Sequence, residues 1–492
     1  MKMKMRAVAF KKMMTSTSVV MFIIIIAVTS CGKKDNDPKP GPPVQASVGH
    51  ARVWLTMGDQ SSLLAQQNDI AITALKDNAS IKLDTTSLLQ EIDGFGAALT
   101  GSSAYLINKK MSASQRSSLL KNLFHPTDGI GISYLRMSIG ASDFSTSNYS
   151  YDDIPAGETD YPLDNFTIAK DKEDVVPVFK QIITVTPAIK IMGSPWSPPA
   201  WMKTNGNLAG GSLKADAFES YAQYFVKYIK AFAAEGITIE AITPQNEPLY
   251  GTAGYPCLNM SADDQRTFIK NNLGPAFRDA NIKTKIFTYD HNWDVTSYAI
   301  SILNDAEAAS YIAGSAFHAY GGDVSAMTSV HNTNPSKGLY FTEISGGDWS
   351  PDFDSNLQWF TSTIFIGTTK NWSKNVLLWN LALDENNGPQ NNGCNNCRGV
   401  VTINSGSGTV TKNVEYYAIG HFSKFIKPGA HRISSTIDGS VKVDHIAFMN
   451  TDGSKVLVVA NGGGDQQTFS VSLGPKQFVY TIPAKAVATI VW

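Results

Sequence analysis

Residues 217–243 read AFESYAQYFVKYIKAFAAEGITIEAIT and contain the unit from which we expect the fold to be built. The first part of this stretch places large apolar residues at helical spacing, which predicts an amphipathic helix over residues 217–234. These apolar residues are Phe218, Tyr221, Phe225, Tyr228, Ile229 and Phe232. The run Ile237–Thr243 follows and is short and apolar, as in a buried β-strand. A helix followed by such a strand is typical of a parallel α/β sheet.

Seven further apolar runs of this kind lie before and after residues 217–243. With Ile237–Thr243 they make eight expected strands: Ile92–Leu99, Ile132–Ile139, Ile189–Trp196, Ile237–Thr243, Lys285–Tyr289, Ile312–Phe317, Leu339–Ile344 and Val376–Leu381. A second helix is expected over Ser261–Ala280, because a serine cap and acidic residues open it. Eight strands alternating with helices predict a (β/α)8 barrel. A doubly wound sheet is the alternative, but its GxGxxG fingerprint is absent.

The C-terminal part of the chain has a different pattern. From about Arg432, β-like runs follow one another without helices, and residues 50–90 are strand-like as well. The C-terminal runs are His445–Asn450, Lys455–Ala460, Phe469–Leu473 and Ala486–Trp492, and the first two predict a hairpin with a Gly-containing turn. We therefore expect a β-sandwich built from both chain ends. The expected divisions are residues 50–91 and 429–492 for the β-sandwich and residues 92–428 for the barrel.

Composition and charge narrow the function classes. The chain has 492 residues, of which 43% are hydrophobic and 17% charged, so it fits an ordered globular protein and not a disordered one. The first thirty residues hold five basic residues and no acidic one, and the remainder has 36 basic and 42 acidic residues, a net charge of −6. A mildly acidic surface repels phosphate backbones, which argues against a nucleic-acid partner.

The N-terminus has the pattern of a targeting segment. Basic residues precede the apolar run Val19–Val28, which is too short to span a bilayer because a spanning helix needs about 20 residues. Small residues then lead to Cys31, as in a bacterial lipoprotein signal, although a secretory peptide with an incidental cysteine is the alternative. We expect residues 1–30 to be a signal peptide, residues 31–49 to be a flexible linker, and a lipid on Cys31 to anchor the protein in the bacterial cell envelope, at the outer-membrane surface or the periplasmic face.

Three cysteines follow Cys31, namely Cys257, Cys394 and Cys397. The spacing of Cys394 and Cys397 permits a tight disulfide in an oxidising compartment. Two free thiols are the alternative, and the spacing does not decide between them. A lone Cys-x-x-Cys lacks the further ligands of a zinc site, and no P-loop or HExxH motif is present. We therefore expect neither a metal nor another cofactor.

Two glutamates lie at the carboxyl ends of expected barrel strands, where barrel enzymes place their chemistry. Glu247 follows the fourth strand in Thr243–Pro248, and Glu343 follows the seventh strand in Tyr340–Ser345. A single glutamate at such a position is more often a structural ion-pair partner. Two of them facing one barrel mouth match the pair that a retaining glycosidase needs, with one nucleophile and one acid/base.

Several longer motifs resemble glycoside hydrolase family 30. They are Asn246-Glu247-Pro248 and residues 94–100, 193–203, 379–383 and 420–425. The resemblance runs from about Asp93 to Trp492. It implies a barrel joined to a β-sandwich, cleavage with retention of anomeric configuration, and no need for a metal.

The resemblance also implies roles for individual residues. Glu247 resembles the acid/base and Glu343 the nucleophile, so Glu247 requires a raised pKa. Asn246 is expected to donate to the sugar 2-hydroxyl, and Asp143 to accept from hydroxyls of the glycone. The remaining expected site residues are Trp196 and Trp379 as walls of the sugar pocket, His318 and Tyr320 beside the nucleophile, and Arg136, which keeps Glu343 ionised. Several of these residues also have a purely structural alternative. Asp143 would be a turn aspartate, Trp196 and Trp379 core residues, His318 a structural histidine, and Arg136 a member of a plain ion pair.

The family includes glucosylceramidases, β-glucosidases, endo-β-1,6-glucanases and xylan-cleaving enzymes, so the substrate needs a separate argument. The segments Leu383–Gly399 and Tyr289–Asp294 look most like the β-1,6-glucanase subgroup. We therefore expect a monomer that cuts unbranched β-1,6-glucan internally, with glucosylceramide, aryl β-glucosides or xylan as alternatives. A surface glycan-binding lipoprotein without activity is the non-enzyme alternative, and the presence of both glutamates argues against it.

Overall fold

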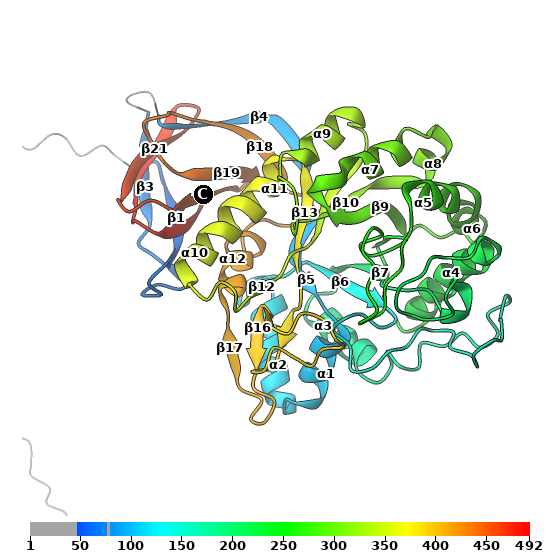
Figure 1. The fold of residues 1–492 in the computed structure, drawn as a ribbon. Coiled ribbons are helices and arrows are strands. Elements are labelled where there is room, and N and C mark those ends of the chain that lie inside the picture. The colour runs from blue at the N-terminus through cyan, green and yellow to red at the C-terminus, as the bar shows by residue number, and fades with distance from the viewer. Residues whose placement is uncertain (1–46, 76–78) are drawn as a thin grey trace, which may run out of the picture. The chain divides into compact units, whose positions relative to one another are not determined.

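The eight expected strands form a closed parallel barrel in the computed structural model, which describes residues 47–75 and 79–492. They hydrogen-bond in chain order, and the last strand pairs with the first (Figure 1). The strands are β5 (Gly94–Ala98), β6 (Tyr134–Ile139), β7 (Lys190–Pro195), β8 (Ala241–Ile242), β9 (Lys285–Asn292), β10 (Ile312–His318), β11 (Gly338–Glu343) and β13 (Ser373–Leu378). The predicted (β/α)8 barrel is therefore confirmed.

The fourth strand is much shorter than expected. The apolar run predicted a strand over Ile237–Thr243, whereas β8 pairs with its neighbours only over Ala241–Ile242. Pro244 follows closely and has no N–H to extend the ladder. Glu247 therefore lies on an irregular loop beyond the strand.

The fifth and eighth strands end at other residues than expected. β9 continues beyond Tyr289 to Asn292, so Asp290 belongs to the barrel wall. β13 ends at Leu378, which leaves Trp379 in the following loop. Asn380 has a φ of 59°, a left-handed conformation outside the β region in which regular strands continue.

Helices lie on the outer side of the barrel (Figure 1). They are α1 (Gly101–Lys109), α2 (Ala113–Phe124), α3 (Val175–Val185), α4 (Phe218–Ala234), α5 (Ala262–Phe268), α6 (Gly274–Asp279), α7 (Thr296–Leu303), α8 (Ala306–Tyr311), α9 (Ala326–Thr333), α10 (Phe353–Trp359), α11 (Thr368–Lys370) and α12 (Val414–Ser423). The π-helical segments η3 (Ile269–Leu273) and η5 (Phe360–Gly367) join α5 to α6 and α10 to α11. The Ser261 hydroxyl accepts from the Asp264 N–H, so the predicted cap is present.

Both chain ends contribute to a ten-stranded antiparallel-rich sheet, as expected (Figure 1). Its strands are β1 (Gly49–Met57), β2 (Ala65–Gln66), β3 (Ile70–Ala74), β4 (Ile81–Glu91), β18 (His431–Ile437), β19 (Asp444–Met449), β20 (Lys455–Asn461), β21 (Gln467–Leu473), β22 (Lys476–Ile482) and β23 (Ala486–Val491). The spatial order is β2-β1-β23-β20-β19-β18-β4-β21-β22-β3. β1 also pairs with β3, so the sheet closes around its own apolar core.

The helix α12 joins the barrel to the sheet. His421 on this helix is fully buried and bonds Thr489 of β23 and Thr56 of β1, each at 2.8 Å. Burial lowers the pKa of His421 to about 3, so this histidine is neutral and structural. The family-like motif of residues 420–425 therefore serves the junction between the two parts and not the site.

Loops beyond β11 and β13 carry short strands of their own. β12 (Gly346–Gly347) pairs with β15 (Cys397–Arg398), and β14 (Ala382–Leu383), β16 (Val401–Ile403) and β17 (Val410–Lys412) form a three-stranded sheet. Within residues 47–75 and 79–492, every helix is too short or too polar to serve as a transmembrane span. The expected signal peptide, most of the expected linker and Cys31 lie outside the described residues.

Candidate active site

Glu247 and Glu343 meet in one cavity at the carboxyl end of the barrel. Glu343 is the last residue of β11, and Glu247 follows β8. One oxygen of each carboxylate and one His318 nitrogen lie within 4.8 Å of one another. The cavity has a volume of about 380 Å³. It is lined by Asp143, Trp196, Asn246, Glu247, Tyr250, Tyr255, His291, Asn292, Tyr320, Glu343, Trp349, Trp379, Cys394 and Cys397.

Arg136 lies inside the barrel and hydrogen-bonds three side chains of this site. Its side chain extends from β6 and is fully buried. Its guanidinium donates to Glu343 Oε2, to Asn246 Oδ1 at 2.7 Å and to Asp290 Oδ2 at 2.8 Å. The side-chain carbonyl oxygen of Asn246 accepts from Arg136. The side-chain amide nitrogen of Asn246 is therefore the group available to a sugar hydroxyl.

Asp290 is the central buried acid of the site, and no role was predicted for it from the sequence. Its Oδ2 accepts from Arg136 and from the hydroxyls of Ser194 and Thr243, each hydroxyl at 2.7 Å. Its Oδ1 accepts from Thr342 at 2.6 Å. Burial raises its pKa, but the charge of Arg136 and these hydrogen bonds outweigh burial and hold the pKa of Asp290 well below its usual range. Its position directly after a β-like run was the signal in the sequence, but the expected strand ended at Tyr289, three residues before the end of β9.

His318 connects Asp290 to the acid/base candidate. Its Nδ1 lies 3.0 Å from Glu247 Oε1, and its Nε2 lies 3.1 Å from Asp290 Oδ1. Burial lowers the pKa of His318, but the surrounding carboxylates of Glu343, Asp290 and Glu247 raise it to about 9. His318 is therefore cationic at neutral pH and donates from both ring nitrogens.

The pKa of Glu247 differs from the expectation. Burial raises the pKa of both glutamates. At Glu247 the hydrogen bond and charge of His318 outweigh burial, so its pKa is lowered. At Glu343 burial exceeds the opposing effects of His318 and Arg136, so its pKa is raised. Arg136 does lower the pKa of Glu343 as expected, and the cationic His318 lies one hydrogen bond from Glu247.

The raised pKa of His318 predicts a pH-dependent contribution to stability. Its pKa is about 9 in the folded protein and about 6.5 when unfolded. The stabilisation is therefore fully present below pH 6.5 and is lost as the pH rises through 9. We expect the difference in unfolding free energy between the wild type and His318→Gln to shrink by on the order of 3 kcal/mol from pH 6 to pH 9. Urea denaturation of both proteins across this range measures it, and a constant difference would contradict the assignment.

The backbone of Glu247 is held in a strained conformation. Its φ is +46°, in the left-handed region, and Tyr289 and Asp290 on the neighbouring strand have φ values of 78° and 62°. The Glu247 N–H donates to the Asp290 carbonyl at 3.0 Å, which ties the two strained segments together. Strain of this kind costs about 1–3 kcal/mol per residue and persists where the surrounding structure enforces it, commonly at active sites.

Tyr320, Trp196 and Trp379 line the cavity as expected, in different ways. The Tyr320 hydroxyl donates to Glu343 Oε1 at 3.1 Å. Trp196 and Trp379 stack on each other with ring centroids 5.0 Å apart, and the Arg136 guanidinium lies over both rings. They are only 2% and 3% exposed, so they close the inner end of the cavity and leave little ring surface open.

Asp143 reaches the cavity from the loop after β6. Its Oδ1 is buried without a hydrogen-bond partner, as expected for a group that accepts from sugar hydroxyls. Burial, with the charges of Glu343 and Glu247, raises the pKa of Asp143 well above its usual range. The Asn391 N–H donates to the Asp143 carbonyl at 2.7 Å, so the Asn-rich loop of residues 386–396 packs beside it.

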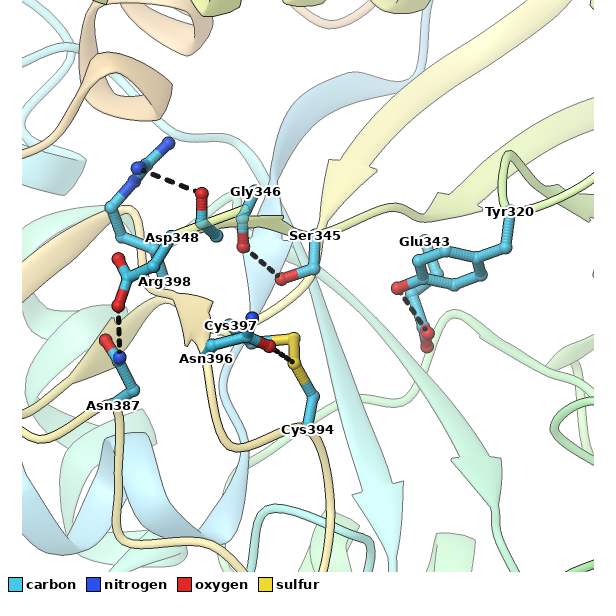
Figure 2. The surroundings of a disulfide bond; sticks show 11 residues. Tyr320, Glu343, Ser345, Gly346, Asp348, Asn387, Cys394, Asn396, Cys397 and Arg398 are labelled. Atoms are coloured by element: carbon cyan, nitrogen blue, oxygen red, sulfur yellow. Dashed lines mark hydrogen bonds between the residues drawn. A yellow bond between two sulfur atoms is a disulfide. The ribbon is translucent and has the colours of Figure 1, made fainter. Parts of the chain in front are cut away.

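Cys394 and Cys397 form a disulfide that lines the cavity (Figure 2). Cys257 is a buried free thiol whose sulfur accepts the N–H groups of Gly210 and Thr252. It therefore organises the loop that carries Tyr250 and Tyr255. These two tyrosines stack with ring centroids 6.3 Å apart, and no role was predicted for them from the sequence.

Glu247, His318 and Glu343 together also have the donor types of a metal site, and no other such group was found in residues 47–75 and 79–492. The surroundings do not suit a metal ion. Both nitrogens of the cationic His318 are engaged with carboxylates, and Arg136 already places its positive charge on Glu343. A bound cation would face two resident cations. The site therefore fits acid/base chemistry better than metal binding.

Comparison with known proteins adds two family matches and several relatives. The model of the glycosyl hydrolase family 30 TIM-barrel domain matches residues 92–426, and that of the family 30 beta sandwich domain matches residues 429–490. The endo-1,6-beta-D-glucanase of Neurospora crassa is 38% identical over 393 residues, covering 77% of this chain and 80% of that protein. The lysosomal acid glucosylceramidase of Mus musculus is 29% identical over 463 residues, covering 88% of each chain. A solved structure of the endo-beta1,6-glucanase BT3312 matches with a TM-score of 0.85 and 36% identity, covering 90% of this chain and 99% of that one.

Proposed function

Because the chain belongs to glycosyl hydrolase family 30, we propose that it is a retaining glycosidase that cuts β-1,6-linked glucan internally, with Glu247 as acid/base and Glu343 as nucleophile. The spacing of the two carboxylates carries the proposal. Retaining enzymes separate their carboxyl groups by about 5–5.5 Å, whereas inverting enzymes need about 6.5–9.5 Å to admit a water. Oxygens of Glu247 and Glu343 within 4.8 Å of one another match the retaining geometry.

In the first step Glu343 attacks the anomeric carbon while Glu247 gives its proton to the leaving oxygen. The Tyr320 hydroxyl and Arg136 hold the two oxygens of Glu343, which leaves its carboxylate oriented for attack. The Nδ1 nitrogen of His318 lies 3.0 Å from Glu247 Oε1, so His318 orients the group that must deliver the proton. The product of this step is a glycosyl ester on Glu343 and a free leaving-group hydroxyl.

In the second step Glu247 takes a proton from water, and the resulting hydroxide attacks the same carbon and releases Glu343. Formation of the ester removes the negative charge of Glu343, which lowers the pKa of Glu247 and favours its role as base. Asn246 and Asp143 would hold sugar hydroxyls during both steps. Two displacements at one carbon restore the original anomeric configuration.

The choice of a β-1,6-linked glucan has two supports. The relatives cited above at 36–38% identity are named as β-1,6-glucanases, whereas the glucosylceramidase is 29% identical. A β-1,6 linkage adds a rotatable bond, so its chain bends and needs an open, hydrogen-bonding rim. The polar loop of residues 386–396 reaches the cavity at Cys394, and Asn392 of this loop donates to the Gly254 carbonyl at 2.9 Å.

A polysaccharide panel tests this proposal. The purified protein is incubated with β-1,6-glucan, xylan, glucosylceramide and an aryl β-glucoside, and products are sized over time. We expect gluco-oligosaccharides to be the first products from β-1,6-glucan. NMR should show that the β-anomer of these products forms first. Faster cleavage of glucosylceramide or the aryl glucoside would contradict the substrate choice. Glucose as the sole early product would contradict internal cleavage, and no cleavage at all would favour the glycan-binding alternative.

We also propose that a lipid on Cys31 anchors the protein in the bacterial cell envelope. The support is the basic, apolar and small-residue pattern of residues 1–30. Cys31→Ala should move the protein from the membrane fraction to the soluble fraction without changing its activity on soluble substrate. Cys257→Ala is the matched control and should leave the membrane fraction unchanged. Wild-type protein that is wholly soluble in its native cells would contradict the anchor.

A further inference from the structure

A second hollow continues from the catalytic cavity. It has a volume of about 600 Å³, within the usual range of about 300–1,000 Å³ for ligand pockets. We call it the outer groove, and it is lined by Ala319, Tyr320, Ile344, Ser345, Gly346, Trp349, Ser350, Ser355, Asn356 and Trp359. Tyr320 and Trp349 also line the catalytic cavity, so a chain leaving the cavity past these two residues enters the outer groove.

The lining of the outer groove suits a neutral sugar. The described residues that line it include no charged side chain, so it lacks a partner for a uronic acid. Trp349 is 55% exposed and Trp359 is 39% exposed, which is unusual for such large rings. Aromatic faces stack on the C–H faces of pyranoses, and the serine side chains that also line the groove carry hydroxyls that can bond those of a sugar. Ile344 and Ala319 are the only aliphatic members, too few for the alkyl chains of a ceramide.

The Trp349 ring is held in place although it is exposed. A Cβ added at Gly347 would lie 2.0 Å from this ring, so only glycine lets the ring rest on the backbone. The neighbouring Asp348 N–H donates to the Asn396 carbonyl at 2.9 Å, and Asn387 donates to the Asp348 carboxylate at 2.7 Å (Figure 2). The loop of Trp349 is thereby tied to the disulfide loop, and a positioned ring loses little entropy on binding.

Trp359 faces the same groove from a rigid helix. It is the last residue of α10 and directly precedes the π-helix η5, an irregularity that often accompanies functional sites. The Asn356 amide donates to the carbonyls of Ser350 and Asp352, each at 2.6 Å. These bonds fix the segment between the two tryptophans, so both rings belong to one ordered surface.

We infer that the outer groove binds glucosyl units on the leaving-group side of the scissile bond, with the rings of Trp349 and Trp359 as stacking surfaces. This inference rests on the proposed function. The stacked Trp196 and Trp379 close the inner end of the cavity, where the sugar attacked by Glu343 must lie. The leaving part of the chain therefore exits past Tyr320 and Trp349. Such a surface gives an enzyme that cuts internally a preference for long chains, because remote contacts lower the barrier at the reacting centre.

Trp359→Ala tests the inference, because Trp359 lines the outer groove and not the catalytic cavity. kcat/KM is measured on a β-1,6-linked glucohexaose and on the β-1,6-linked disaccharide. We expect the loss on the hexaose to exceed the loss on the disaccharide about 10-fold, the size of a typical important contact. Trp359→Phe should retain most of the chain-length preference. Tyr161→Ala removes an aromatic ring of 45% exposure outside both hollows and should leave activity unchanged.

Two further measurements show whether Trp359 contacts the leaving-group side of the glucan chain. In a Glu343→Gln background, Trp359→Ala should weaken hexaose binding in calorimetry by about the same factor. With a hexaose labelled at its reducing end, Trp359→Ala should shift cuts toward that end, because leaving-group contacts no longer contribute. Equal losses on both substrates, or a shift toward the other end, would overturn the inference while the proposed function stands. If the wild-type protein does not cut β-1,6-glucan of any length, both this inference and the proposed function are overturned.

Discussion

Replacing Glu343 with alanine should reduce turnover of β-1,6-glucan by about 10³-fold or more, the largest effect expected for any single residue of this protein. Glu343 is the carboxylate that Arg136 and Tyr320 hold at the end of β11, and no other described carboxylate in the cavity receives both contacts. Its loss removes the atom that forms the covalent intermediate. The rate is measured as reducing ends released per minute from the polysaccharide.

The stereochemistry of azide rescue makes this prediction specific. Azide fits the space left by the Glu343 side chain and attacks an aryl β-glycoside from the side of the missing nucleophile. The expected product of Glu343→Ala is therefore the α-glycosyl azide. Glu240→Ala is a matched control, because Glu240 directly precedes β8 at the opposite end of the barrel and pairs with Lys285 at 2.7 Å. Full activity is expected for the control, and a β-glycosyl azide from Glu343→Ala would reverse the assignment.

Glu247→Ala should lower turnover of the polysaccharide by about 10²–10⁴-fold, the usual contribution of a positioned acid/base. The sugar hydroxyl that leaves from β-1,6-glucan is a poor leaving group, so it requires the proton that Glu247 delivers. Aryl β-glycosides with very acidic leaving groups should be cleaved to the glycosyl-enzyme at nearly the normal rate. Stopped-flow release of the phenol followed by slow turnover measures this difference.

Azide should rescue Glu247→Ala in the opposite sense. The glycosyl-enzyme on Glu343 still forms, and azide then attacks it from the face where water normally enters. The β-glycosyl azide is the expected product. Equal loss of activity on activated and unactivated substrates would show that Glu247 acts through structure and not through proton transfer.

The sequence alone was sufficient for the barrel and for the two glutamates. Eight apolar runs alternating with helical periodicity predicted eight barrel strands, because this periodicity reports locally which residues are buried. Glu247 and Glu343 were found because their strand-end positions and the surrounding motifs are local properties. The strand-rich character of both chain ends was also visible, although β2, β3, β4, β18 and β22 were not predicted as separate strands.

The network around the glutamates was beyond the reach of local patterns. Arg136 and Glu343 are 207 residues apart, and Arg136 and Asp290 are 154 residues apart. Asp290 looked like a loop aspartate because β9 continues past the end of its apolar run. His318 was expected beside the nucleophile, whereas its two ring nitrogens bond Glu247 and Asp290.

The outer groove is likewise a product of tertiary structure. Trp349 and Trp359 lie on one segment of the chain, but the segment is positioned by Asn387 and Asn396, which follow another strand. The sequence determined which segments are strands and which residue types end them, because burial of an apolar face is decided over a few neighbouring residues. Only the closed barrel decided the pKa values, the partners and the shape of the site, because charges and hydrogen bonds act between atoms that the fold brings within a few ångströms from distant parts of the chain.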